Sequence, residues 1–114
     1  MIQNKTQNTE GFWEISPETL LENKAQLRLI DVRRPDEYSG ELGHIAGAEL
    51  VTLETEFQKL VETWDKEKPI AFICRSGGRS GKATAYAQAL GFKEVYNMQG
   101  GMLLWNAKAL PVEK

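Results

Sequence analysis

Cys74, the only cysteine of the chain, is followed directly by the run Arg75-Ser76-Gly77-Gly78-Arg79. Gly77 and Gly78 permit backbone conformations that other residues avoid, so successive amides can turn inward as a nest for a small anion. A cysteine thiolate is such an anion, and neighbouring arginines favour it. The run therefore predicts a reactive cysteine inside an anion-binding loop.

The alternative for Cys74 is an inert cysteine in the core. This is the commoner fate of an isolated cysteine, since free cysteine is among the most buried residue types. A core cysteine needs neither two glycines nor two arginines after it, and those charges would be unfavourable beside a packed strand. The neighbours of Cys74 therefore favour the reactive interpretation.

The elements on either side of Cys74 position it for chemistry. Residues 69–73 form a continuous apolar run, which is typical of a strand buried on both faces of a parallel sheet. Residues 80–90 predict a helix with Ala83, Ala87 and neighbouring apolar side chains on one stripe, ended by Gly91. Ligands of open α/β sheets gather at the carboxyl ends of the strands, beside helix N-termini. Cys74 lies at such a position.

The rest of the chain alternates strands and helices, which indicates an α/β fold. Residues 27–30 predict a strand that delivers Asp31 and Arg33 to a loop, so both are candidate site residues. Thr52 is expected to cap a helix whose apolar face holds Leu53, Phe57, Leu60, Val61 and Trp64. We also expect a short helix that Ser16 caps and a helical turn at residues 35–39. Strands are expected at residues 48–51 and 95–97, and a closing helical turn at residues 102–106, with Trp105 in the core. We expect residues 1–10 to be a flexible lead-in and residues 11–114 to form a single domain.

Composition limits the possible functions. The 114 residues are 41% hydrophobic and 26% charged, as in ordinary globular domains. The formal net charge of -2, without a dense basic run, gives no basis for a nucleic-acid partner. No window has the apolar length of a membrane span, no signal peptide is evident at the start, and one cysteine forms no internal disulfide. We therefore expect a cytoplasmic protein without a membrane partner.

Three segments resemble signatures of the rhodanese family. CRSGGRS is similar to the family's active loop, LIDVRRPDEYSGELGHIAGAELV to its first signature, and MQGGMLLW to its second. Together the resemblance covers nearly all of residues 15–111. It departs from the family pattern at Ala46, where many members have proline, and at Met98, where leucine is usual.

The resemblance implies a rhodanese-like fold, with a mostly parallel central sheet flanked by helices on both faces. It implies a sulfurtransferase in which the Cys74 thiolate takes the outer sulfur of an anionic donor, thiosulfate or a persulfide, and passes it to cyanide or to a thiol, including a protein thiol. The main-chain amides of residues 75–79 would hold the Cys74 persulfide. Asp31 and Arg33 would face the loop, with Asp31 pairing with Arg79 or with loop amides. No metal or cofactor is implied.

Several roles stay open at the level of sequence. Arg75 and Arg79 are candidates to steer the donor, and Ser76 to bind the sulfur or merely a turn amide. His44 fits a hydrogen-bonded scaffold better than a general base, because transfer from a preformed thiolate needs none. A cysteine phosphatase or arsenate reductase is disfavoured, since those loops place five residues between cysteine and arginine and this one places four. A non-enzymatic sulfur carrier or interaction module is the remaining alternative.

Overall fold

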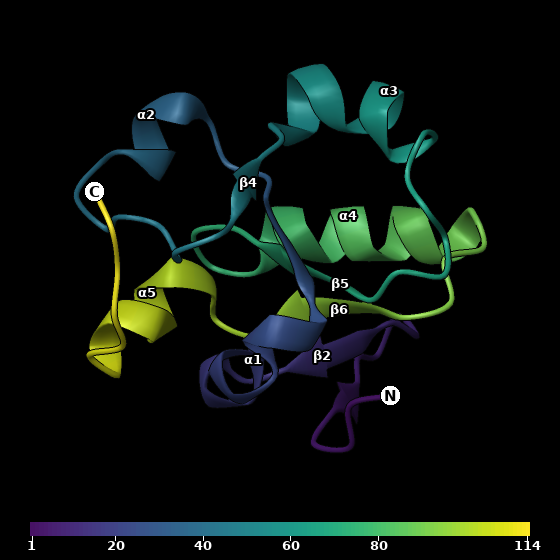
Figure 1. Ribbon diagram of the computed structural model, residues 1–114, viewed down its shortest axis with the longest axis horizontal. Coiled ribbons are helices and arrows are strands. Elements are labelled where there is room, and N and C mark those ends of the chain that lie inside the picture. The colour runs from purple at the N-terminus through teal and green to yellow at the C-terminus, as the bar shows by residue number, and fades with distance from the viewer.

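The computed structural model describes all residues from Met1 to Lys114 and is built on one six-stranded sheet (Figure 1). The strand order is β1-β2-β6-β5-β3-β4, and every neighbouring pair is parallel except β1 with β2. The strands are β1 (Thr6–Gln7), β2 (Trp13–Ile15), β3 (Arg28–Asp31), β4 (Glu49–Leu50), β5 (Ile70–Ile73) and β6 (Val95–Met98).

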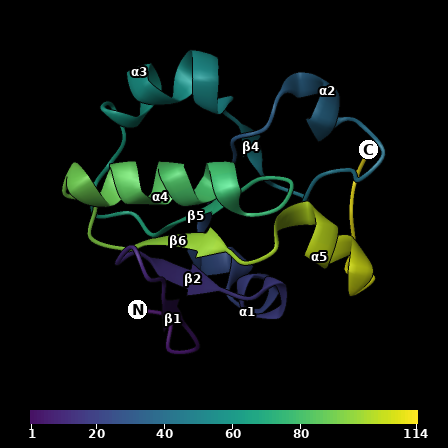
Figure 2. The same cartoon turned by 180° about the vertical axis from the view of Figure 1, so that it is seen from behind.

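Helices cover both faces of this sheet, as the α/β rhodanese-like prediction requires. Figures 1 and 2 show α3 and α4 on one face and α1 and α5 on the other. None of the helices has the length and apolar character needed to cross a membrane. The helices are α1 (Pro17–Glu22), η1 (Lys24–Gln26, a 3₁₀ turn), α2 (Pro35–Tyr38), η2 (Leu53–Phe57, a π-helical turn), α3 (Gln58–Val61), α4 (Gly78–Ala89) and α5 (Gly101–Ala107).

The core is split into two apolar clusters by the central strands. In β5, Ile70 and Phe72 pack with the cluster under α3 and α4, whereas Ala71 and Ile73 pack with the cluster that includes Trp105 of α5. All four β5 residues are fully buried, because alternate side chains of a strand point to opposite faces and both faces are covered. The buried strand and the buried Trp105 that the sequence predicts are confirmed.

The helix after the cysteine loop packs closely on the sheet. Ala83 and Ala87 of α4 are fully buried, and their small side chains let the helix backbone approach β5 and β6. The helix begins two residues before the predicted start, at Gly78, and Gly91 follows its last turn with φ +100°. This close packing of α4 on the sheet positions the start of α4 relative to the end of β5, where Cys74 lies.

The segment after β4 differs from the predicted single helix. Residues 53–57 form a π-helical turn before α3. Thr52 occupies the predicted N-cap position, but its hydroxyl donates to the Arg33 carbonyl oxygen (2.9 Å) and accepts no hydrogen bond from a helix amide. Phe57 and Val61 are buried as expected, but Leu60 is 40% exposed. A π turn holds more residues than an α turn, so the apolar stripe shifts and leaves Leu60 outside it.

The first ten residues also differ from the expected lead-in, because they pack on the sheet. Thr6 and Gln7 pair with β2, Ile2 is buried among core residues, and the Ile2 amide donates to the Tyr96 hydroxyl (3.3 Å). This polar segment is therefore held on the domain by the buried Ile2 and by the two-residue strand β1. Its polar composition gives no indication of these contacts.

Candidate active site

Cys74 follows β5 directly and is buried, with its sulfur inside the turn that leads into α4. The Gly77 amide donates to Cys74 Sγ (3.0 Å), and the Ser80 hydroxyl lies 3.2 Å from the same atom. Gly77 has φ +105°, a conformation that glycine adopts without strain, and this turns its amide toward the sulfur. One amide of the loop therefore faces the sulfur, and the N-terminus of α4 adds its favourable field for negative charge.

Two carbonyl groups of this loop are bound by amides of α5. The Met102 amide donates to the Cys74 carbonyl oxygen (2.8 Å), and the Leu103 amide donates to that of Arg75 (2.9 Å). Amides in the first turn of a helix lack partners within the helix and are free to bind other acceptors. With these carbonyls fixed by α5, the loop amides are the groups left for an anion.

Gly101 makes this contact between α5 and the loop possible. Its φ is +56°, and a Cβ added there would lie 2.4 Å from the carbonyl carbon and oxygen of Arg75 and 2.5 Å from the oxygen of Cys74. No side chain fits in that space. Gly101 of the MQGGM segment therefore allows the start of α5 to lie against the backbone of the cysteine loop.

Behind the sulfur, Ser80 and Asn97 form a buried polar pair that the sequence did not reveal. Asn97 Oδ1 is 2.5 Å from the Ser80 hydroxyl oxygen, and its Nδ2 donates to Glu14 Oε2 (2.8 Å) and to the Gly77 carbonyl (3.2 Å). Ser76, the serine considered from the sequence, is exposed and makes no hydrogen bond to the sulfur. A serine in the first turn of the helix after the loop was the available signal.

Arg79 pairs with Glu37 of α2, which corrects the expected pairing with Asp31. Arg79 Nη1 and Nη2 donate to the two carboxylate oxygens of Glu37 at 2.7 and 2.8 Å. These hydrogen bonds lower the pKa of Glu37 to about 2, and in turn raise the pKa of Arg79. Glu37 also accepts from the Arg34 amide (3.1 Å), so it joins α2 to the last residue of the cysteine loop.

Asp31 is bound instead by Arg33. The Arg33 guanidinium donates to both carboxylate oxygens of Asp31 (2.8 and 2.9 Å), and both side chains are almost completely buried. Arg33 also donates to the carbonyl oxygens of Gly43 (2.8 Å) and Glu37 (3.2 Å). Both carboxylate oxygens of Asp31 are therefore bound by Arg33, and Asp31 makes no hydrogen bond to the cysteine loop. Through its further hydrogen bonds, Arg33 also connects the end of β3 to the α2 region.

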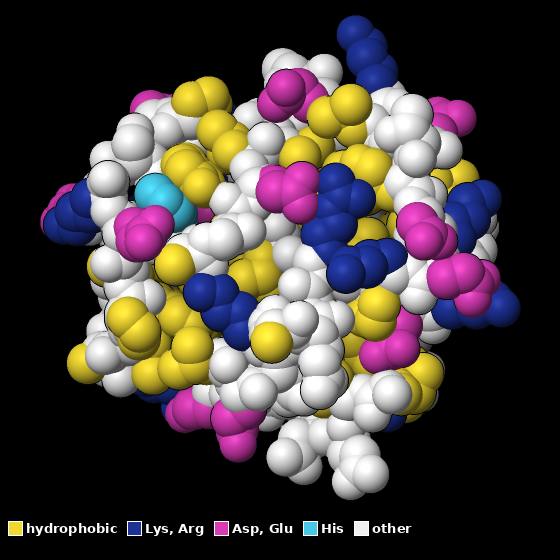
Figure 3. All heavy atoms as spheres, in the orientation of Figure 1, with side chains coloured by type: hydrophobic (Ala, Val, Ile, Leu, Met, Phe, Trp, Pro, Cys, Tyr) yellow, Lys and Arg dark blue, Asp and Glu magenta, His cyan; other side chains and the backbone are white.

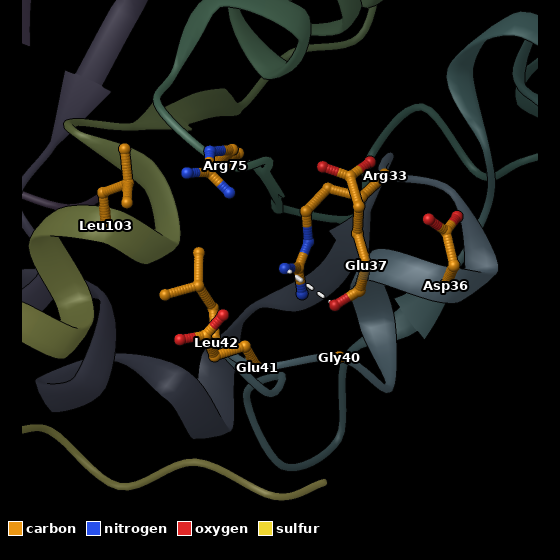
Figure 4. Close-up of a pocket in the computed structure, with 8 residues that line it drawn as sticks. All are labelled: Arg33, Asp36, Glu37, Gly40, Glu41, Leu42, Arg75 and Leu103. Carbon is orange, nitrogen blue, oxygen red and sulfur yellow. Dashed lines mark hydrogen bonds between the residues drawn. The ribbon is translucent and has the colours of Figure 1, made fainter.

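Arg33 and Arg75 both line a hollow of about 410 Å³ beside the loop. Figure 4 shows Arg75 and Leu103 on one side of this hollow and Arg33 with Glu37 on the other. Arg75 is exposed and has no ion-pair partner, so it is the loop arginine that remains available to an anion. The visible face in Figure 3 has acidic and basic side chains intermixed, without a large patch of one charge.

His44 has the scaffold position expected from the sequence. Its Nδ1 is 3.0 Å from the Tyr38 carbonyl oxygen, and its ring stacks on the Tyr38 ring at a centroid distance of 3.8 Å. Its backbone bridges Glu113 near the end of the chain. No contact joins His44 to Cys74, in agreement with a structural role.

Comparison with known proteins agrees with this geometry. The family model described as a rhodanese-like domain matches residues 16–108. The chain is 40% identical to the uncharacterized protein YqhL of Bacillus subtilis over 75% of its own length, and it spans 64% of that relative. It is 33% identical to the thiosulfate sulfurtransferase GlpE of Pseudomonas paraeruginosa, covering 87% of this chain and 88% of the relative. A rhodanese-related protein from Thermoplasma volcanium superposes with a TM-score of 0.77 at 29% identity, covering 88% and 96% of the two chains.

The cysteine loop, the sheet order and these matches define one class of protein. The chain belongs to the rhodanese-like domain family.

Proposed function

We propose that this protein is a sulfurtransferase that carries a sulfane sulfur as a persulfide on Cys74. The observation that carries the proposal is the cysteine sulfur, which is buried in a tight loop and bound by an inward-facing amide at 3.0 Å. Four residues separate Cys74 from Arg79, so the ring of amides suits one sulfur atom better than a phosphate. The similarity to a thiosulfate sulfurtransferase supports the same reaction class.

In the first half-reaction, the Cys74 thiolate forms a bond to the outer sulfur of thiosulfate. The bond between the two thiosulfate sulfurs breaks, and its electron pair leaves with sulfite. The negative outer sulfur of the new persulfide would be stabilised by the loop amides of residues 75–79, while Arg75 attracts the incoming dianion. In the second half-reaction, cyanide or a thiol, including a thiol on another protein, removes the outer sulfur and regenerates the thiolate.

Intact-mass measurement tests the proposal directly, because Cys74 is the only thiol. Incubation with thiosulfate should add the mass of one sulfur atom, and cyanide should remove it with formation of thiocyanate. Cys74→Ala should abolish both changes. Thiosulfate:cyanide sulfur transfer that survives in Cys74→Ala would overturn the proposal, and so would the absence of any sulfur uptake by the wild type from thiosulfate or polysulfide.

A further inference from the structure

Ser80 provides the one side-chain group within hydrogen-bond distance of the Cys74 sulfur. Its Oγ lies 3.2 Å from Sγ, and the residue is completely buried at the start of α4. The same Oγ lies 2.5 Å from Asn97 Oδ1. A hydroxyl has a single hydrogen, so Ser80 donates either to the sulfur or to Asn97 at any moment.

The orientation of Asn97 is fixed by its other contacts. Its Nδ2 faces a carboxylate oxygen of Glu14 and the carbonyl oxygen of Gly77, which are both acceptors. Asn97 Oδ1 is therefore the atom that faces Ser80. Asn97 is 2% exposed, so no bulk water competes for this contact, and it holds the Ser80 hydroxyl in place beside Sγ.

The charge on Sγ changes during sulfur transfer, and the Ser80 hydrogen can follow it. In a persulfide, the negative charge lies on the outer sulfur and Sγ is a neutral bridging atom, so the hydroxyl donates to Asn97. In the thiolate, Sγ is negative and attracts the hydroxyl, because hydrogen bonds to ionised acceptors are the stronger ones. Rotation of one hydroxyl is the only movement needed.

We propose that Ser80 is a catalytic residue of the second half-reaction, in which it stabilises Cys74 Sγ as the leaving thiolate, and that Asn97 is its positioning residue. This inference rests on the proposed persulfide function. In the step concerned, the acceptor forms a bond to the outer sulfur, the bond from Sγ to the outer sulfur breaks, and its electron pair goes to Sγ. Ser80 donates a hydrogen bond to Sγ and keeps its proton.

The two half-reactions should therefore depend differently on Ser80. During loading, Sγ loses negative charge as it attacks the donor. Removal of the hydroxyl therefore destabilises the transition state no more than it destabilises the starting thiolate, and the barrier does not rise. During release, Sγ gains charge, so the missing donor raises the barrier. For Ser80→Ala we expect release to slow by about 10- to 100-fold, the usual effect of losing one donor to developing charge. Loading, compared at the pH plateau of each variant, should change by less than about threefold.

Single-turnover measurements separate the two steps. Each protein is loaded with thiosulfate, freed of excess donor and mixed with cyanide, while thiocyanate and intact mass are followed. Ser80→Ala should accumulate as the persulfide form under turnover. Ser80→Thr keeps a hydroxyl on the same carbon and should release sulfur at close to the wild-type rate.

Thr84 offers the matched control, because its buried hydroxyl lies one turn further along α4 and donates to the Ser80 carbonyl (2.7 Å) without contacting sulfur. Thr84→Val should leave both half-reactions unchanged. A similar loss of release in Thr84→Val, or an equal loss of loading and release in Ser80→Ala, would overturn the assignment. A wild type that takes up no sulfur would refute the proposed function by itself.

A second variant tests the hydroxyl while Ser80 is kept, and it covers the case in which Ser80→Ala does not fold. Asn97→Asp combined with Glu14→Gln preserves the net charge and a hydrogen bond between these two positions. The carboxylate at position 97 should hold the Ser80 hydroxyl more strongly and keep it from the sulfur. Because the variant also loses the hydrogen bond from Asn97 to the Gly77 carbonyl, both half-reactions can slow, but we expect release to slow by a clearly larger factor than loading. Release that slows no more than loading would contradict the inference.

Discussion

Gly101→Ala should distort the cysteine loop, although Gly101 lies outside that loop, at the start of α5. The added Cβ would lie 2.4 Å from carbonyl atoms of Arg75 and 2.5 Å from the oxygen of Cys74. These are backbone atoms, so no side-chain rotation relieves the overlap. We expect the start of α5 to move away from the loop, which breaks the hydrogen bonds from Met102 and Leu103 to the two carbonyl oxygens.

The size of the effect follows from two costs. Alanine at a φ of +56° costs about 1–2 kcal/mol, and an overlap in a close-packed region costs a further 1–3 kcal/mol or so. The free energy of unfolding should therefore fall by about 2–5 kcal/mol. Typical domains have about 5–15 kcal/mol in total, so a folded population should persist for assay.

Gly91→Ala is the matched control, because Gly91 also has a positive φ (+100°) but a Cβ there would meet no atom within 4 Å. It should lose only the backbone cost of about 1–2 kcal/mol. Urea unfolding gives both stabilities, and intact mass after timed exposure to thiosulfate gives the loading rate of the folded protein. We expect Gly101→Ala to load at least about tenfold more slowly, since misplaced donors cost that much or more, and Gly91→Ala to load normally. Equal stability losses, or normal loading by Gly101→Ala, would refute the reasoning.

Further predictions concern the charges and the size of the loop. Glu37→Gln should lower the free energy of unfolding at neutral pH by about 1 kcal/mol, because it removes a paired, partly buried carboxylate. The pKa of Glu37 falls from 4.5 to about 2 on folding, so the stability that the ion pair contributes is complete above about pH 4.5 and is lost as the pH falls toward 2. In urea titrations, the free energies of unfolding of the wild type and Glu37→Gln should therefore become equal over that pH range. A difference that stays constant with pH would contradict the pairing. Arg75→Gln should raise the KM for thiosulfate several-fold, by about 3- to 10-fold, with a smaller effect at high salt, and an unchanged KM would remove Arg75 from donor attraction. One glycine inserted between Gly77 and Gly78 should move the Gly77 amide from the sulfur and reduce sulfur transfer by about a hundredfold or more, whereas undiminished transfer would show that loop length is not selective.

The predictions from sequence succeed where the signal is local. An apolar strand, a cysteine, two glycines and a helix follow one another without interruption in residues 69–90, so the local sequence determines their order in space. The buried β5 and the helix beyond the loop are found as expected, and one loop amide, that of Gly77, faces the sulfur.

The remainder of the site depends on contacts between distant segments. Glu14, Asn97 and Ser80 lie on β2, β6 and α4, and they meet because β6 is placed between β2 and β5 in the sheet. The partner of Arg79 could not be chosen from the sequence either, since several acidic residues follow β3. Arg33 folds back onto Asp31 and satisfies its oxygens, which leaves the α2 carboxylate to Arg79.

The edge strands of the sheet affect how readily the protein aggregates in concentrated solution. Each edge strand, β1 and β4, is only two residues long, and Glu49 of β4 is exposed and paired with Arg28. Edges this short present few free backbone groups to another chain. The apolar central strand β5, which would aggregate readily if exposed, is therefore shielded from edge-to-edge pairing by edge strands too short to serve as templates.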